Sequence, residues 1–180
     1  MARKKTEEIR KSASKDNGGV QVIIETPRGC RNKYKFEEKT GRVKLSKVLP
    51  EGMMFPYDFG FVPDTKADDG DPIDVLVLID EPTFPGCEME CRLIGVIEAE
   101  QKEGDEERHR NDRIIAVAKQ SLLYGEIKNI EELNPTVLKQ IEAFFTNYQK
   151  VRNIEYKIIG VGGADRAADL LRKSRRKKAA

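Results

Sequence analysis

The sequence is poor in the residues that bind zinc or form disulfides, and it contains no long apolar run. Its 180 residues include a single histidine, His109, and three cysteines without Cys-x-x-Cys spacing, Cys30, Cys87 and Cys91. Neither a disulfide framework nor a structural zinc site is indicated. No segment is apolar enough to span a membrane or to serve as a secretory signal after the basic start of the chain. We therefore expect a cytoplasmic protein with no membrane partner.

Charge is distributed unevenly along the chain, although the formal net charge is only +2. Residues 1–18 carry six Lys or Arg against three Asp or Glu, and residues 161–180 carry seven against two. The body is therefore acidic, which does not suit nucleic acid, because single-stranded binders present aromatic side chains in a basic groove. We expect residues 1–19 to form a flexible basic N-terminal arm and residues 20–180 to form one domain that ends in a basic helix.

Hydrophobic patterns predict short strands first and helices late in the chain, which is typical of the α+β class. The pattern around residues 134–148 predicts a helix with Asn134 as its N-cap and Pro135 in its first turn. A closing helix is expected from about residue 164 to 178, and the polar residues 98–113 are expected to form a long hairpin tip. Strands are predicted over residues 20–25, 33–37, 42–48, 75–79, 91–97 and 114–118, which together indicate a small barrel with helices packed against it.

The segment 68–74 contains four carboxylates, those of Asp68, Asp69, Asp71 and Asp74, directly before an apolar strand. Carboxylates at this spacing raise one another's pKa unless a cation lies between them, and their oxygens suit Mg²⁺, Mn²⁺ or Ca²⁺. Gly70 allows a sharp turn beside them. The pattern predicts a cation site at a strand entrance.

The acidic segment has two alternative interpretations besides a cation site, and a glycine-rich segment near the end of the chain also needs one. An acidic surface turn is the plain alternative. An EF-hand is excluded, because Gly70 at its sixth position would put Thr65, Ala67 and Leu76 at ligand positions. The glycines at 160–163 lack the third glycine of a dinucleotide loop and predict a helix-start turn.

A basic hairpin precedes the acidic segment. Lys33 and Lys47 fall in its two predicted strands. We expect this hairpin to lie on the same small sheet as the acidic strand. There the two lysines could hold an anion.

The run from Asp69 to Leu76 is Asp-Gly-Asp-Pro-Ile-Asp-Val-Leu and resembles the signature of the family I soluble inorganic pyrophosphatases. The similarity extends over about residues 20–160. The resemblance implies a five-stranded OB-like barrel with C-terminal helices packed against it. It also implies hydrolysis of pyrophosphate to two phosphates by a metal-activated water, with Mg²⁺ or alternatively Mn²⁺ as cofactor. Family members in bacteria are usually homohexamers.

Carried over position by position, the resemblance makes Asp71 the general base and places metal ligands at Asp69 and Asp74. Several positions depart from the family pattern. The family's phosphate-binding arginine is Lys47, its tip aspartate is Asn111, and a second metal-binding aspartate falls near Gln101. A shifted loop would bring Asp112 and Glu100 to the site instead. The expected metal-binding residues are Glu25, Asp69, Asp71, Asp74, Asn111 and Asp112, and the expected substrate-binding residues are Lys33, Lys47, Arg113, Tyr148 and Lys150.

Two other functions remain open on the sequence. Lys35, Phe55 and Phe59 differ from the family's residues and favour a phosphohydrolase for another phosphoanhydride. The basic ends and the barrel fold would also suit a non-enzymatic protein that binds a polyanion.

Overall fold

The computed structural model describes residues 19–179, apart from the side chain of residue 176. Most of the predicted N-terminal arm lies outside the described residues, and Gly19 already belongs to the first strand. The strands are β1 (Gly19–Thr26), β2 (Asn32–Glu37), β3 (Arg42–Val48), β4 (Asp58–Val62), β5 (Ile73–Leu78), β6 (Glu88–Glu103), β7 (His109–Arg110), β8 (Arg113–Ala118) and β9 (Ile154–Gly163), and the helices are η1 (Ile130–Glu132), α2 (Pro135–Lys150) and α3 (Ala164–Ala179).

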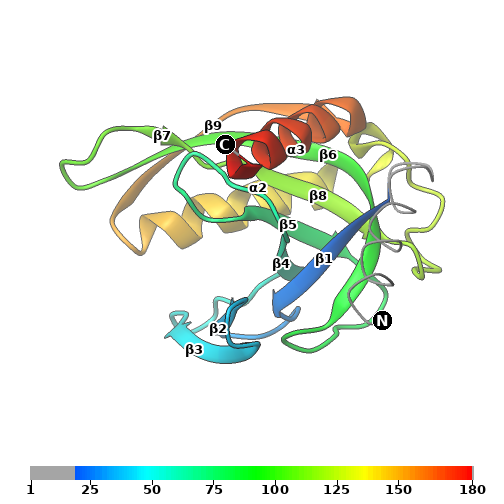
Figure 1. The fold of residues 1–180 in the computed structure, drawn as a ribbon, viewed down its shortest axis with the longest axis horizontal. Coiled ribbons are helices and arrows are strands. Elements are labelled where there is room, and N and C mark those ends of the chain that lie inside the picture. Colours follow the sequence, from blue (N-terminus) through cyan, green and yellow to red (C-terminus); the bar gives the residue numbers. More distant parts are fainter. Residues whose placement is uncertain (1–18, 180) are drawn as a thin grey trace.

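Five strands close into a ring in the order β1, β4, β5, β8 and β6, because β6 also pairs with β1 (Figure 1). Only β5 and β8 pair in parallel within this ring. All five strands contribute to one buried cluster, to which α3 adds Ala167 and Leu171. The five-stranded OB-like barrel of the α+β class is confirmed.

Helix α2 covers the other face of the sheet. Residues that alternate with the first cluster, such as Leu76 and Ile115, pack with Ile141 and Phe145 of α2. The predicted cap is present, because the Asn134 side chain accepts a hydrogen bond from the Thr136 amide at 2.9 Å. Two apolar faces per strand explain why these strands are near-continuous apolar runs.

Gly60 permits the close approach of β4 to β1. A Cβ atom at this position would overlap the backbone carbonyl of Ile23 and lie 2.9 Å from the Cα of Ile24. The barrel therefore depends on the absence of a side chain here.

The hairpin of β2 and β3 forms a separate two-stranded sheet below the barrel (Figure 1). The expectation that Lys33 and Lys47 share a sheet with the acidic strand is therefore wrong. Nearly every residue of β3 is exposed. The hairpin projects beside the strand entrance and leaves apolar side chains of β3, such as Leu45 and Val48, exposed.

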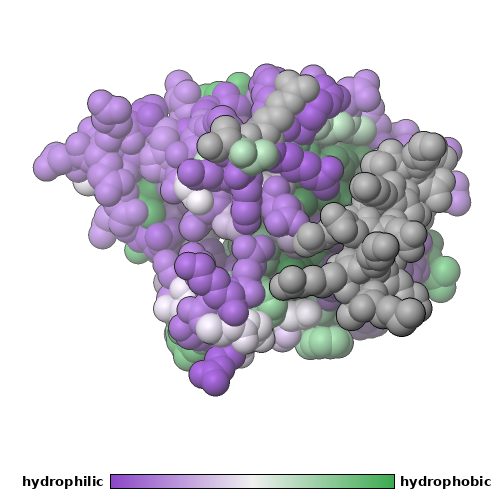
Figure 2. Space-filling view, viewed as in Figure 1, coloured by the Kyte–Doolittle hydropathy of each residue, from purple (hydrophilic) through white to green (hydrophobic). Residues whose placement is uncertain are grey.

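The polar segment 98–113 forms a long hairpin tip, as predicted: the chain turns back after Glu103, so that β7 and β8 pair antiparallel with β6. Strand β6 also pairs with β9 from Gly95↔Gly163 to Glu103↔Ile154 and with β7 through Gln101↔His109. Partners about 50 to 70 residues away satisfy the backbone of this polar strand, and composition alone does not reveal them. Figure 2 shows hydrophilic residues over this projecting part and over α3.

The glycines at the end of β9 lead into α3, as predicted for a helix-start turn. Asn129 accepts a hydrogen bond from the Ala164 amide at 3.3 Å and lies against Gly163. Within the described residues, no helix is long and apolar enough to cross a membrane.

Candidate active site

A pocket of about 840 Å³ opens where the β2–β3 hairpin faces the loop before β5 and the C-terminal end of α2. Strand β1 contributes Glu25, and β6 and β8 contribute residues to the far wall. Its charged and amide lining residues are Glu25, Lys33, Lys35, Glu37, Glu38, Lys39, Lys47, Asp69, Asp71, Asp74, Gln101, Asn111, Arg113, Gln149 and Arg152.

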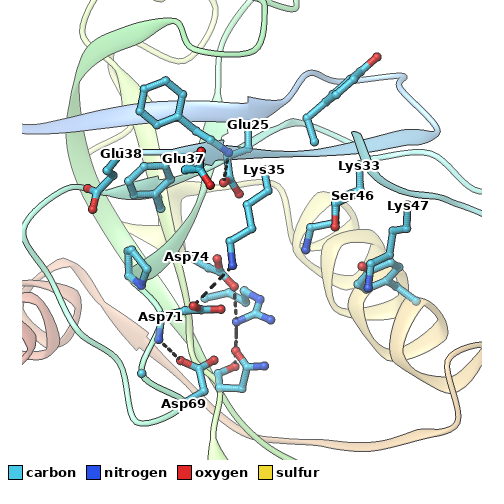
Figure 3. Close-up of a pocket in the computed structure, with 18 of the residues that line it drawn as sticks. Glu25, Lys33, Lys35, Glu37, Glu38, Ser46, Lys47, Asp69, Asp71 and Asp74 are labelled. Atoms are coloured by element: carbon cyan, nitrogen blue, oxygen red, sulfur yellow. Dashed lines mark hydrogen bonds and ion pairs between the residues drawn. The ribbon is translucent and has the colours of Figure 1, made fainter. Parts of the chain in front are cut away.

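The acidic loop is held by a buried threonine and by its own aspartates. The Thr65 hydroxyl donates to the Val62 carbonyl at 2.6 Å and accepts from the Ile73 amide at 2.9 Å. The Asp69 carboxylate accepts from the Asp71 amide at 3.1 Å across Gly70, whose φ of 87° favours glycine. These contacts place Asp69, Asp71 and Asp74 along one side of the pocket (Figure 3).

Glu25 faces the same side from the end of β1. It is 8% exposed, and its carboxylate accepts from the Phe36 amide at 2.8 Å. Burial raises the pKa of Glu25, and the charge of Asp74 raises it further. Although Asp69 lies at the pocket mouth, partial burial also raises the pKa of its carboxyl, with Asp74 and Asp71 adding to the effect. The acidic side therefore holds more negative charge than its surroundings stabilise.

Two protein cations partly neutralise this side. Arg113, 5% exposed, forms an ion pair with Asp74 at 2.8 Å. Lys35 reaches from β2 to Asp71 at 3.6 Å, where both side chains are well exposed (Figure 3). The second contact is loose and screened by solvent, so Asp71 remains available to a ligand.

Lysines of the hairpin form the opposite side (Figure 3). The Lys33 ammonium lies 5.1 Å from the ring centre of Phe59 and 5.7 Å from that of Tyr148. Burial lowers the pKa of Lys47. Both lysines line the pocket opposite the acidic loop, and their role toward an anion stays a prediction.

The far wall is a network of amides and guanidinium groups. The Gln101 carbonyl accepts from Asn111 and, at 3.2 Å, from Gln149. The Arg113 guanidinium donates to the Asn111 carbonyl, and Arg152 donates to the Gln149 carbonyl at 2.8 Å. Among the described residues this wall presents no carboxylate to the pocket.

The structure brings most predicted site residues together but leaves Asp112 and Lys150 out of the pocket. Asp112 does not line the pocket, because its carboxylate accepts from the Ala99 amide at 3.0 Å and from Arg110 at 2.9 Å. Neighbouring side chains of an extended segment point to opposite sides, so Asn111 and Arg113 face the pocket and Asp112 does not. Glu100, the alternative ligand, and the exposed Lys150 do not line the pocket either.

Arg152 lines the pocket although the sequence reasoning did not select it. Its guanidinium lies 5.3 Å from the ring centre of Tyr148, four residues earlier. Arg152 lies just beyond the end of α2, where the Val151 cap keeps helical backbone angles, so its spacing of four residues from Tyr148 was the signal that could have identified it.

The acidic side suits a divalent cation by its chemistry. Four carboxylates supply hard oxygen ligands, and a cation would favour the charged forms of Glu25 and Asp69, whose pKa values are raised by burial and by neighbouring aspartates. Within residues 19–179, however, no group of three or more His, Cys, Asp or Glu side chains is arranged to hold a metal ion. A bound cation would therefore draw the carboxylates together and compete with Arg113 and Lys35 for Asp74 and Asp71.

Fold and pocket together define a class: OB-like barrel proteins in which carboxylates face lysines and arginines across a polar pocket. Comparison with known proteins specifies the class further. The sequence model of inorganic pyrophosphatase matches residues 22–179, so the chain belongs to the inorganic pyrophosphatase family.

Similar proteins cover nearly the whole chain. The inorganic pyrophosphatase of Methanosarcina acetivorans is 37% identical over 86% of this chain and 89% of its own length. That of Nostoc sp. is 38% identical over 87% and 90%. The crystal structure of the inorganic pyrophosphatase from Thermus thermophilus superposes with a TM-score of 0.83 at 30% identity, covering 92% of this chain and 94% of the other.

Proposed function

We propose that this protein hydrolyses inorganic pyrophosphate to two phosphates with the aid of a divalent metal ion. Family membership over residues 22–179 supports the reaction. The observation that carries the proposal is the single pocket in which the acidic loop faces the hairpin lysines and Arg113. Such a pocket can hold a cation and a phosphorylated anion side by side, which is what phosphoryl transfer to water requires.

We assign the metal to the acidic side, with Asp69, Asp74 and Glu25 as ligands and Asp71 beside them. Inorganic pyrophosphatases depend on metal ions, and we propose Mg²⁺, with Mn²⁺ as the alternative, because all the ligands are carboxylate oxygens. When bound, the ion would neutralise substrate charge and lower the pKa of a coordinated water.

Asp71 is the proposed general base. Its carboxylate is exposed in the pocket, and its backbone is fixed through the hydrogen bond between its amide and Asp69. Lys35 lies 3.6 Å from the carboxylate in a solvent-exposed ion pair and leaves the carboxylate accessible. The carboxylate is therefore free to accept a proton from the attacking water.

Three positive side chains and one tyrosine would bind the phosphoryl groups. Lys33 and Lys47 approach from the hairpin, and Arg113 and Tyr148 approach from the barrel and α2. Their donors would stabilise the charge that develops on the departing phosphate. Their fixed positions over aromatic rings reduce the reorganisation that this requires.

Release of phosphate from pyrophosphate with Mg²⁺ or Mn²⁺ tests the proposal. Asp71→Asn should lower kcat by roughly 10²- to 10⁴-fold, the usual contribution of a general base, without loss of folding. Asp68→Asn is the matched control, because Asp68 belongs to the same loop but lies outside the pocket and pairs with Lys177. Full activity in Asp71→Asn would remove Asp71 as the base, and no hydrolysis by the unaltered protein would overturn the function.

A second candidate is hydrolysis of another phosphoanhydride. The pocket continues past the acidic side to Arg152, and Phe36 and Phe61 add apolar side chains to its lining. A panel of pyrophosphate, triphosphate and nucleoside diphosphates separates the two substrate classes by kcat/KM.

Three further expectations stay predictions. These are the cytoplasmic location, the homohexamer implied by the family resemblance, and the division into an arm of residues 1–19 and one domain of residues 20–180. Light scattering after size-exclusion chromatography tests the assembly. Limited proteolysis tests the domain boundary.

A further inference from the structure

We propose that the far wall of the pocket binds a phosphoryl group directly, with no metal ion between protein and anion. This wall consists of three amides and two arginines, namely Gln101, Asn111, Gln149, Arg113 and Arg152. That the anion is a phosphoryl group follows from the proposed function, whereas the preference of the wall for an anion follows from its hydrogen bonds.

The arginines determine how the amides are oriented. A guanidinium group is only a donor, so the group of Asn111 that faces Arg113 must be its carbonyl. The same holds for Gln149, whose carbonyl faces Arg152 at 2.8 Å. The amide nitrogens of both residues then point to Gln101, whose carbonyl accepts from both. No independent choice of amide orientation is left in this network.

This arrangement excludes a cation from the wall. A metal ion needs oxygen lone pairs, yet both lone pairs of the Gln101 carbonyl are occupied. The carbonyls of Asn111 and Gln149 each face a positively charged guanidinium group, which would repel a metal ion. The metal role expected for Asn111 is therefore replaced by a role toward an anion.

Donors, in contrast, are in excess. Arg113 is 5% exposed, and its Nε has no hydrogen-bond partner among the described residues. The hydroxyl of Tyr148, 4% exposed, likewise has none. Buried donors without acceptors are costly, and the oxygens of an anion in this part of the pocket would relieve that cost after a small local shift.

The two arginines are held in place before any ligand binds. The Arg113 guanidinium lies 5.5 Å from the ring centre of Phe145, and that of Arg152 lies 5.3 Å from Tyr148. Arg113 also pairs with Asp74 and so connects the wall to the acidic side. A diphosphate could thus place one phosphoryl group at the metal and the other at the wall.

Isothermal titration calorimetry with inorganic phosphate in excess EDTA tests the wall without turnover. We expect saturable binding by the unaltered protein and at least tenfold weaker binding by Arg152→Gln, which removes a half-exposed side chain. Lys139→Gln is the charge-matched control, because Lys139 is exposed on α2 outside the pocket. No phosphate binding in EDTA, or equal loss in both variants, would overturn the proposal.

A second variant tests the exclusion of metal from the wall. Asn111→Asp keeps the size of the side chain and adds an oxygen ligand beside Arg113. It should weaken phosphate binding in EDTA and tighten Mn²⁺ binding, measured by electron paramagnetic resonance. Unchanged affinities for phosphate and for Mn²⁺ in a folded Asn111→Asp protein would contradict the proposed anion-binding role of the wall.

The wall and the proposed function fail in different ways. Phosphate binding in EDTA without any hydrolysis of pyrophosphate would retain the wall and overturn the function. Hydrolysis without metal-free phosphate binding would retain the function and overturn the wall.

Discussion

Replacing Arg113 with methionine should destabilise the protein strongly in EDTA and much less in Mg²⁺. Arg113 and Asp74 lie 2.8 Å apart, with side chains 7% and 27% exposed. At an effective dielectric constant of about 20, unit charges at this distance attract by roughly 6 kcal/mol before desolvation is counted. Loss of one partner of a buried pair costs roughly 3–5 kcal/mol, and partial hydration of Asp74 reduces this to about 2–3 kcal/mol.

Metal should compensate for the lost guanidinium. In the unaltered protein a cation must compete with Arg113 for Asp74, whereas in Arg113→Met it meets a free carboxylate. A ligand at 100 times its Kd stabilises the folded state by about 2.7 kcal/mol, so the tighter-binding variant should gain more from Mg²⁺ than the unaltered protein.

Urea unfolding in EDTA and in Mg²⁺ measures both the loss of stability caused by Arg113→Met and its compensation by the metal. The difference in unfolding free energy between the two proteins should shrink by at least about 1 kcal/mol when Mg²⁺ replaces EDTA. Arg113→Lys, which keeps the charge but loses the planar fork, should lie between them. If the unfolding free energies of the unaltered protein and Arg113→Met differ by the same amount in EDTA and in Mg²⁺, Arg113 and the metal do not compete for Asp74.

Three other changes test separate parts of the structure. Gly60→Ala places a Cβ against the backbone of Ile23 and should lower the unfolding free energy by about 3 kcal/mol or more, measured by urea unfolding; a loss below 1 kcal/mol would show that β4 can move. Glu98→Gln tests the contact of β6 with α3. The hydrogen bond from Arg166 lowers the pKa of Glu98 below its ordinary value of 4.5. This contact therefore stabilises the fold fully above pH 4.5, and the stabilisation is lost as the pH falls through the lowered pKa. The variant should therefore be less stable than the unaltered protein at pH 7 and equal to it in acid, and a pH-independent difference in urea midpoint would contradict the assignment. Tyr148→Phe removes a buried hydroxyl that lacks a partner among residues 19–179, so stability should stay the same or rise by about 0.5–1 kcal/mol while KM for pyrophosphate rises; a clear loss of stability would reveal a structural role for the hydroxyl.

Local patterns predicted those parts of the fold whose cause is local. The helix from Pro135 begins where its asparagine cap and proline indicate, and its apolar spacing matches the face that packs on the sheet. The geometry of the acidic loop also follows from its local sequence, because Gly70 allows the left-handed turn that lets the Asp69 carboxylate accept a hydrogen bond from the Asp71 amide. Short-range hydrogen bonds and backbone sterics act within a few residues, so a single segment is enough to predict them.

Contacts between distant segments were decided by the tertiary structure. Strand β6 pairs from Gly95 to Glu103 with β9, about 60 residues later in the chain, in addition to its local partner β7. The hairpin with Lys33 and Lys47 forms a sheet of its own outside the barrel, although its strands carry apolar residues such as Phe36 and Leu45. The choice of Asn111 over Asp112 for the pocket depends on which side of an extended segment points inward, and a shift of one residue reverses it.

The sequence by itself placed the chain in the inorganic pyrophosphatase family and predicted a cation site and a phosphate-binding hairpin within one domain. Only the tertiary structure decided what faces the acidic loop across the pocket. The side-chain amides of Asn111 and Gln101 could, from the sequence alone, bind a metal ion through oxygen or an anion through nitrogen. Arg113 and Arg152 take up the carbonyls of Asn111 and Gln149, whose nitrogens then occupy the carbonyl of Gln101. The orientation of an amide depends on its neighbours in space, and these neighbours lie up to 48 residues apart in the chain.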